Sequence, residues 1–274
     1  MRIVDCHNDF LSKLNLSQIK NYVEYLEQCD IERLSCSFWT SDKFKSSIID
    51  EIKDKWEIVK AVNCDRYLLH IEDLWFVDDF KKIIELNPFS CSLTWNRDNK
   101  FCGGCYGWAG LNKAGERIVR QMKENKILVD LAHLNKKSFY QVLDIVCDRP
   151  YVSHTSFDFV VKDKRNLDDD QIREIIARNG FIGLFFFEKL TNSKNHSAKG
   201  IAKIIAKFIE KFGDENLGLG SDYYGIEKTP KDLTGYQEFY KLESCLIDMG
   251  ITKSQTENVF YKNFQNFINE QKNI

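Results

Sequence analysis

The sequence predicts an α/β fold, a single (β/α)8 TIM barrel, and three observations favour this class. Short runs of β-branched and aromatic residues alternate from end to end with longer, charge-rich segments of helical periodicity, which is typical of repeated βα units. Eight units of this kind can be counted along the chain. The 274 residues also lie close to the roughly 250 that such a barrel contains.

The expected strands are short apolar runs, and the expected helices are the longer segments between them. In chain order the strands cover residues 2–7, 33–39, 66–72, 89–95, 126–133, 150–154, 180–187 and 216–222. The helical stretches include residues 44–62, 112–125, 135–147, 168–179, 199–213 and 234–249. Ile118, Val119 and Met122 recur at helical spacing with charges on the remaining face, which predicts a helix lying on the barrel.

No segment of the sequence marks a boundary between domains. It contains no internal repeat, no proline-rich linker and no shift in composition. Residues 1–274 are therefore predicted to form one barrel domain. Residues 252–270 follow the eighth unit and are expected to form a C-terminal helix that caps the barrel, while the polar residues 191–200 are expected to form an exposed loop.

The composition indicates a compact protein without a charged polymeric partner. Hydrophobic residues make up 43% of the chain, and 39 basic residues nearly balance 41 acidic ones. Neither sign gathers into a block that would recruit nucleic acid or an anionic membrane. The N-terminus lacks the apolar run of a signal peptide, and no stretch approaches 18 apolar residues. We therefore expect a cytoplasmic protein with a small-molecule substrate and no membrane or nucleic-acid partner, and assembly as a homodimer is left open.

The nine cysteines are scattered and lie mostly in apolar runs, which predicts reduced core residues rather than a disulfide framework. Cys102 and Cys105 form one CxxC with two glycines between them. A structural zinc site needs four ligands, and no second CxxC is present. We interpret this motif as a coincidence or a glycine turn.

Polar residues with metal-ligand chemistry follow the expected strands, at the ends where (β/α)8 enzymes carry their reactive groups. They are His7, Asp9, Glu72, His133, His154 and Asp222. Each of these residues alone is weak evidence for a metal site, since a histidine among apolar residues is more often a hydrogen-bonded core residue than a ligand. Glu72 is stronger evidence, because a carboxylate after the apolar run YLLHI is costly to bury unless a cation or hydrogen-bond donors contact it. Together, three imidazoles and two carboxylates at one barrel mouth fit divalent ions such as Zn²⁺, two of which can share a carboxylate.

Several segments resemble motifs of the membrane dipeptidase (renal dipeptidase) family, peptidase family M19 of the amidohydrolase superfamily. DCHND (5–9) is similar to the family's DxHxD opening, and HIED (70–73) looks like the segment that carries its metal-bridging glutamate. DLAH (130–133) resembles its DLSH motif, and SHTS (153–156) resembles its SHS motif. The chain looks like a short, bacterial-type member of this family.

Three later segments continue the resemblance in the family's order. They are KRNLDDDQIREI (164–175), GLGSDYYG (218–225) and YKNFQNF (261–267), which resemble its RNL-D-QI, GxDxDG and C-terminal GNxxR/L-like motifs. The chain also departs from the pattern. Trp95 and Asn96 stand where the animal enzymes place a substrate-contacting histidine, Tyr224 replaces the second aspartate of DxDG, and Tyr261 replaces a glycine.

The resemblance implies a zinc-dependent dipeptidase that hydrolyses dipeptides through a metal-bound hydroxide. The implied ligands of its two Zn²⁺ ions are His7, Asp9 and Glu72 for one, and Glu72, His133 and His154 for the other. Arg165 would pair with the substrate carboxylate, a task suited to a planar guanidinium. Asp222 would be the general acid/base, and Trp95 and Tyr223 are expected to line the substrate pocket.

Two other functions remain as alternatives. A related amidohydrolase could use the same metals on a lactone, a cyclic amide or a modified peptide, with a pocket reshaped around Trp95 and Tyr224. A catalytically silent barrel that serves as a binding module would be expected to have lost metal ligands, whereas this sequence keeps all five. His70 is interpreted as a core or supporting residue rather than a ligand.

Overall fold

Eight parallel strands form a closed barrel, which confirms the predicted fold class. The computed structural model describes residues 2–41, 47–63, 65–191 and 196–271. The strands are β1 (Ile3–Asn8), β2 (Ile31–Phe38), β3 (Tyr67–Ile71), β4 (Ser90–Ser92), β5 (Leu128–Asp130), β6 (Tyr151–Thr155), β7 (Phe181–Leu184) and β8 (Leu217–Leu219). They follow one another around the barrel in chain order, and Asp5 of β1 pairs with Leu219 of β8 to close it.

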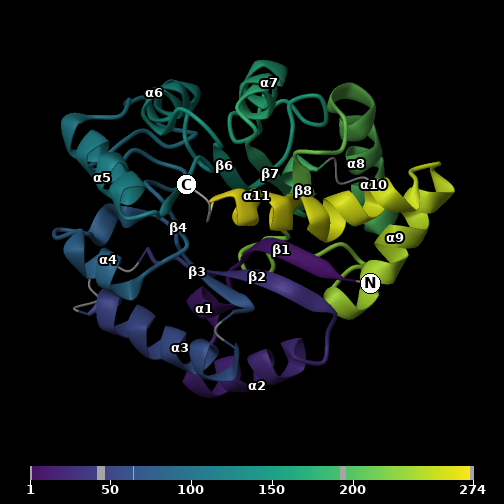
Figure 1. The fold of residues 1–274 in the computed structure, drawn as a ribbon, viewed down its shortest axis with the longest axis horizontal. Helices are drawn as coiled ribbons and strands as arrows, with labels where there is room; N and C mark the ends of the chain where they lie inside the picture. The colour runs from purple at the N-terminus through teal and green to yellow at the C-terminus, as the bar shows by residue number, and fades with distance from the viewer. Residues whose placement is uncertain (1, 42–46, 64, 192–195, 272–274) are drawn as a thin grey trace.

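Helices surround the strands as an outer layer (Figure 1). They are α2 (Leu16–Leu26), α3 (Ile48–Asn63), α4 (Lys81–Leu86), α5 (Lys113–Glu124), α6 (Lys136–Val146), α7 (Asp169–Ala177), α8 (Ala198–Phe212) and α9 (Phe239–Asp248). Shorter elements join them: α1 (Phe10–Lys13) and the 3-10 turns η1 (Leu74–Phe76), η2 (Glu188–Leu190) and η4 (Tyr236–Glu238). The expected ranges omit α2 and α4. The start of the helix expected over 44–62, and part of the loop expected over 191–200, lie outside the described residues.

Capping residues explain where two of the outer helices begin. Asn15 accepts a hydrogen bond from the backbone of Gln18, whose side chain returns a contact to the Asn15 backbone, and this capping box starts α2. Asp168 and Gln171 form the same arrangement at the start of α7. Each box satisfies backbone N–H groups that a helix otherwise leaves without partners at its first turn.

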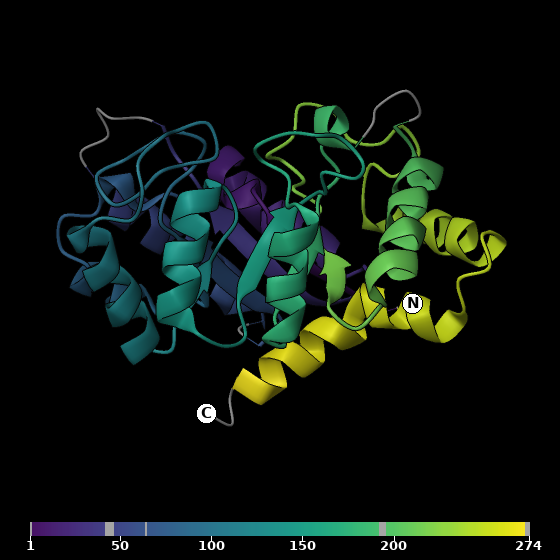
Figure 2. The same ribbon diagram turned by 90° about the horizontal axis from the view of Figure 1, so that it is seen from above.

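The C-terminal segment lies across the end of the barrel where the strands begin (Figure 2). It runs through α10 (Lys253–Glu257), a π-helical turn η5 (Asn258–Lys262) and α11 (Asn263–Gln271). Phe264 and Phe267 of α11 pack on Tyr151 and Phe181, the first residues of β6 and β7. This end of the barrel is therefore filled by aromatic side chains, and the opposite end carries the polar strand termini.

Among the described helices, we find none that combines the length and the hydropathy needed to span a bilayer.

Candidate active site

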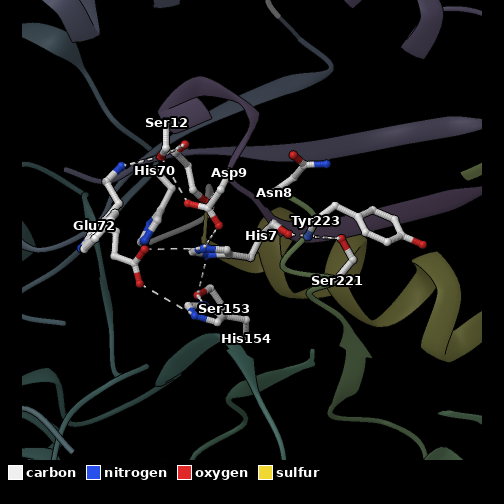
Figure 3. Close-up of polar contacts among 12 residues, drawn as sticks. His7, Asn8, Asp9, Ser12, His70, Glu72, Ser153, His154, Ser221 and Tyr223 are labelled. Carbon is white, nitrogen blue, oxygen red and sulfur yellow. Dashed lines mark hydrogen bonds and ion pairs between the residues drawn. The ribbon is translucent and has the colours of Figure 1, made fainter. Parts of the chain in front are cut away.

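The six polar residues expected at strand ends meet at one mouth of the barrel, and Figure 3 shows four of them. His7 and His154 lie within β1 and β6, and Asp9, Glu72, His133 and Asp222 follow β1, β3, β5 and β8. Backbone hydrogen bonds tie two of these ends together, because Asp222 N donates to His7 O at 3.0 Å and Asp9 N donates to Tyr223 O at 2.8 Å. The segments after β1 and β8 therefore present their carboxylates side by side.

Glu72 turns one carboxylate oxygen toward each of two groups of ligand atoms. Its Oε2 lies 3.8 Å from Nε2 of His7, which is in turn 3.1 Å from Oδ2 of Asp9. Its Oε1 lies 2.8 Å from Nε2 of His133 and 3.8 Å from Nε2 of His154. The two imidazole nitrogens of His133 and His154 face each other at 2.9 Å. A single carboxylate thus joins both groups, as a bridging ligand would.

The donor atoms fit divalent cations. Nε2 of His7 and Oε1 of Glu72 are buried and have no aligned hydrogen-bond partner among the described residues. Burial also holds the pKa of His133 and His154 well below the usual value, so both rings are neutral, the form that binds a metal. Zinc bonds of about 2.0 to 2.2 Å place ligand atoms roughly 3 to 3.5 Å apart in a tetrahedral site, close to the separations observed.

The carboxylates of the cluster carry unbalanced negative charge. Burial raises the pKa of Glu72 and of Asp222 well above the usual values, and repulsion from Asp9 adds to both shifts. Burial lowers the pKa of His7, but the nearby carboxylates of Asp9, Glu72 and Asp222 together outweigh burial and raise that pKa to about 10. A bound cation would reverse these directions by stabilising the ionised carboxylates and the neutral imidazole. The electrostatics therefore favour metal binding at this mouth.

Local backbone geometry sets the direction of two site residues. His133 and Asp222 adopt left-handed conformations with φ of 66° and 63°, which few non-glycine residues adopt. Gly225 follows Asp222 closely, and a Cβ at this position would collide with Oδ1 of Asp222 and Oδ2 of Asp9. Glycine therefore leaves the space that these two carboxylates occupy.

A cavity of about 430 Å³ lies over the cluster. Its lining comprises five of the six site residues, all but His7, together with Lys13, Trp39, Trp95, Asn96, Tyr106, Arg165, Phe185, Phe187, Leu190, Gly225, Ile226 and Glu227. Trp95 lies between Trp39 and His133, with ring centroids 4.7 Å and 6.0 Å away. Trp95 and Arg165, the two residues expected at a substrate pocket, are among the residues that line this cavity.

Arg165 is a buried cation whose guanidinium pairs with no carboxylate in the part of the chain that the structure describes. One of its nitrogens donates to the backbone oxygen of His154 at 2.9 Å, and another lies 3.4 Å from Oγ1 of Thr155. Its carbon Cζ stands 5.4 Å from the centre of the Phe185 ring. These contacts aim the guanidinium at the cavity and leave donors for an anionic ligand.

Tyr223 is not among the cavity-lining residues, contrary to the prediction. Its hydroxyl donates to the backbone oxygen of Leu233 at 2.7 Å, and its ring packs against Phe186 and Tyr236. Figure 3 shows the ring pointing away from the metal-ligand cluster. Asp222 lines the cavity, whereas the side chain of Tyr223 is buried against aromatic residues of the core.

Several lining residues were not expected from the sequence. Phe185 and Phe187 belong to the run GFIGLFFF, in which composition does not separate a pocket residue from a core residue. Tyr106 follows the two glycines of the CxxC motif, whose cysteines are free and buried. The motif forms a close turn, since a Cβ at Gly104 would collide with backbone atoms from Trp95 to Arg97. This observation supports the interpretation of the motif as a glycine turn.

Comparison with known proteins gives a family and a fold. The model of the family "Membrane dipeptidase (Peptidase family M19)" matches residues 79–274. The dipeptidase tcpJ of Claviceps purpurea is 25% identical over 167 residues, which cover 60% of this chain and 39% of the fungal protein. An uncharacterised dipeptidase of Schizosaccharomyces pombe is 26% identical over 240 residues, which cover 81% of this chain and 56% of the yeast protein. The chain thus spans well under two thirds of the length of these relatives.

Solved structures share the fold over nearly the whole chain. The crystal structure of a dipeptidase AC, a metallopeptidase of family M19, has a TM-score of 0.87 at 18% identity and covers 99% of this chain and 98% of that one. A metallopeptidase from Rhodobacter sphaeroides, bound to a phosphinate mimic of the dipeptide L-Ala-D-Ala, has a TM-score of 0.83 at 17% identity and covers 99% of both chains.

Proposed function

The chain belongs to the membrane dipeptidase family, peptidase family M19, and from this premise we propose that it is a zinc-dependent dipeptidase. One observation carries the proposal: Glu72 presents its two oxygens to two separate groups of buried ligand atoms. The dipeptide mimic bound by the Rhodobacter sphaeroides relative supports the same class of substrate.

We assign the metal ligands from this geometry. His7, Asp9 and Glu72 would hold one Zn²⁺, and Glu72, His133 and His154 would hold the other. Imidazole nitrogens and carboxylate oxygens are ligands that Zn²⁺ accepts in tetrahedral or more open sites. When bound, the pair of ions would polarise the scissile carbonyl group and lower the pKa of the attacking water.

Asp222 is the proposed proton carrier. A carboxylate oxygen of Asp222 lies within 4.8 Å of ligand atoms of His7 and Asp9, and the residue lines the cavity. In the reaction its carboxylate accepts a proton from the attacking water and passes a proton to the amine nitrogen of the leaving amino acid. Burial raises the pKa of Asp222, which suits a group that must hold a proton between these two steps.

Arg165 is the proposed anchor for the substrate. Its guanidinium lies at the cavity wall with no carboxylate partner among the described residues, so the free carboxylate of a dipeptide would complete its charge pairing. Holding that end of the substrate fixes the distance from the carboxylate to the scissile bond. A cavity of about 430 Å³ lies in the range of small-molecule sites.

The metal content provides the first test. Purified protein should contain about two equivalents of zinc per chain, because a shared carboxylate typically supports a two-ion site. His133→Ala should lower the content to about one, since His133 belongs to only one group of ligands. Elemental analysis after dialysis measures both values. Wild-type protein that holds no divalent metal, and stays inactive when zinc is added, would contradict the assignment.

Arg165→Lys tests the substrate anchor. Lysine replaces a bidentate fork with a point charge, so kcat/KM for free-acid dipeptides should fall by about 10- to 100-fold, a loss of roughly 1.4 to 2.8 kcal/mol. Dipeptides with an amidated C-terminus serve as the control, because they offer no carboxylate for the guanidinium. An equal loss for both kinds of substrate would show that Arg165 has another role.

The indole rings of Trp39 and Trp95 form one wall of the cavity, and this wall supports one alternative activity. These indole rings occupy space beside His133, and they favour a flat or bulky substrate group there. A related amidohydrolase acting on a lactone, a cyclic amide or a modified peptide would use the same metal ligands. Assays of a zinc-loaded sample against L-L, L-D and D-containing dipeptides, alongside lactones and cyclic amides, separate the two functions.

A further inference from the structure

One buried hydroxyl touches two of the site's imidazoles. Oγ of Ser153 lies 2.7 Å from Nδ1 of His154 and 3.2 Å from Nδ1 of His7 (Figure 3). The same oxygen lies 2.5 Å from Oδ2 of Asp130. All four side chains are buried, so water does not compete for these contacts. His7 and His154 belong to different groups of ligand atoms, and Ser153 is thus placed beneath both.

The direction of these hydrogen bonds follows from the chemistry of the groups. An ionised carboxylate only accepts, so the Ser153 hydroxyl donates its single proton to Asp130. Its oxygen is then left with lone pairs, which accept from both rings. Nδ1 of His7 and Nδ1 of His154 must therefore carry the ring protons, and each Nε2 keeps its lone pair. These Nε2 atoms are the ones that face Glu72.

Asp130 is held so that it cannot turn away from Ser153. Its Oδ1 accepts from the backbone N–H of Ser153 at 2.9 Å and from that of Ala132 at 3.0 Å. With Oδ1 occupied by two backbone donors, Oδ2 faces the Ser153 hydroxyl at 2.5 Å and Nε2 of His70 at 3.5 Å. The carboxylate at the end of β5 and the hydroxyl in β6 thus form one rigid unit.

His133, the third imidazole, is held by a separate residue. Its Nδ1 lies 2.9 Å from Oδ1 of Asn96, which follows β4. The Asn96 oxygen accepts the ring proton and leaves Nε2 of His133 free to face Glu72. Asn96 therefore accepts a hydrogen bond from one ring only, whereas Ser153 contacts one ring in each of the two groups of ligand atoms.

We propose that Asp130 and Ser153 are positioning residues that fix the Nδ1-protonated form of His7 and His154 together, and so couple the two metal positions. The inference rests on the proposed assignment of metal ligands. Partners that orient metal-binding histidines typically change metal affinity by about 10- to 100-fold. Here one carboxylate and one hydroxyl exert that effect on both positions.

Asp130→Asn tests the proposal with almost no change of shape. The two backbone donors keep Oδ1 of the new side chain, so its NH2 group must face Ser153 and donate to Oγ. The hydroxyl proton then turns toward a ring Nδ1, which forces that ring into the Nε2-protonated form. His154 is the nearer ring, so we expect its tautomer to change in the ring ¹H–¹⁵N NMR spectra of the metal-free protein, and a 10- to 100-fold loss of zinc affinity at its position in competition with a chelator.

Two further variants sharpen the test. Ser153→Ala removes the acceptor that both rings share, so it should weaken zinc binding at both positions. It also remains as a test if Asp130→Asn does not fold. Asn96→Ala is the matched control, and it should weaken only the position that contains His133. Circular dichroism and the melting temperature of each metal-free variant separate these effects from unfolding.

The outcomes are distinct. Unchanged tautomers and unchanged zinc affinities in a folded Asp130→Asn variant would overturn the proposal, and loss at only one position in a folded Ser153→Ala variant would overturn the coupling. If wild-type protein binds no metal, the proposed function fails. The tautomer of His154 in the metal-free wild type still decides the hydrogen-bond direction at that ring: protonation at Nδ1 supports it, and protonation at Nε2 contradicts it.

Discussion

Asp222→Asn should keep the fold and the metal content while kcat falls by about 10²- to 10⁴-fold, the usual contribution of a general acid/base. The amide has nearly the shape of the carboxyl group but cannot carry a proton between water and the leaving amine. Asparagine also tolerates the left-handed backbone that Asp222 adopts at φ 63°, so this substitution avoids added strain. Zinc stoichiometry and kcat of the purified variant, measured together, check the prediction.

Asp9→Asn provides the contrast, because Asp9 is assigned to metal binding. An amide oxygen is a poorer ligand than a carboxylate, so this variant should lose metal and recover part of its activity in excess zinc. Asp222→Asn should show no such rescue. Near-normal turnover in a metal-replete Asp222→Asn protein would exclude Asp222 as the proton carrier.

The barrel could be predicted because its strands have a strong and repeated signal. All eight expected strands are present, with ends that differ from expectation by a few residues. One overestimate is at β7, where the apolar run 180–187 continues past the strand, which ends at Leu184. Phe185 and Phe187 then turn toward the cavity. Hydrophobicity alone does not reveal where an apolar run leaves the sheet.

The helical ranges expected from the sequence do not include α2 and α4. α2 lies between two strands in a stretch rich in asparagine, tyrosine and glutamine, and its start depends on the side chain of Asn15. α4 has only six residues and ends at Asn87 in a left-handed conformation with φ 50°. Short helices are marginal in isolation and form here because the barrel supplies a surface for them to pack on.

The site divides into a part that topology predicts and a part that it does not. Parallel strands bring their C-terminal ends to one mouth, so His7, Glu72 and His154 were expected to meet there. Strand topology does not predict the direction of each side chain. Tyr223 is expected at the substrate pocket from its position in the sequence, but its ring points away from the metal-ligand cluster. Asp130 offers no signal of its role, because the effect of a buried carboxylate at a strand end depends on the donors around it.

Glu72→Gln should abolish binding at both metal positions, since Glu72 alone contributes an oxygen to each group of ligand atoms. Turnover should fall by about 10³-fold or more, because the ions supply several kcal/mol of transition-state stabilisation. The metal-free variant should melt at the wild-type temperature or above it. Burial raises the pKa of Glu72, which means that its charge is unfavourable here without a cation, and glutamine removes that charge.

Elemental analysis and melting curves with and without zinc measure both effects. Wild-type protein should gain thermal stability on adding zinc, because a ligand that binds only the folded state stabilises it, and Glu72→Gln should lose this gain. Glu210→Gln is the matched control, as it makes the same chemical change at an exposed position on the outer helix α8. It should retain the metal, the zinc-dependent stabilisation and the turnover. If Glu72→Gln kept two equivalents of zinc, Glu72 would not be the bridging ligand, and the two groups of ligand atoms would have to bind their ions independently.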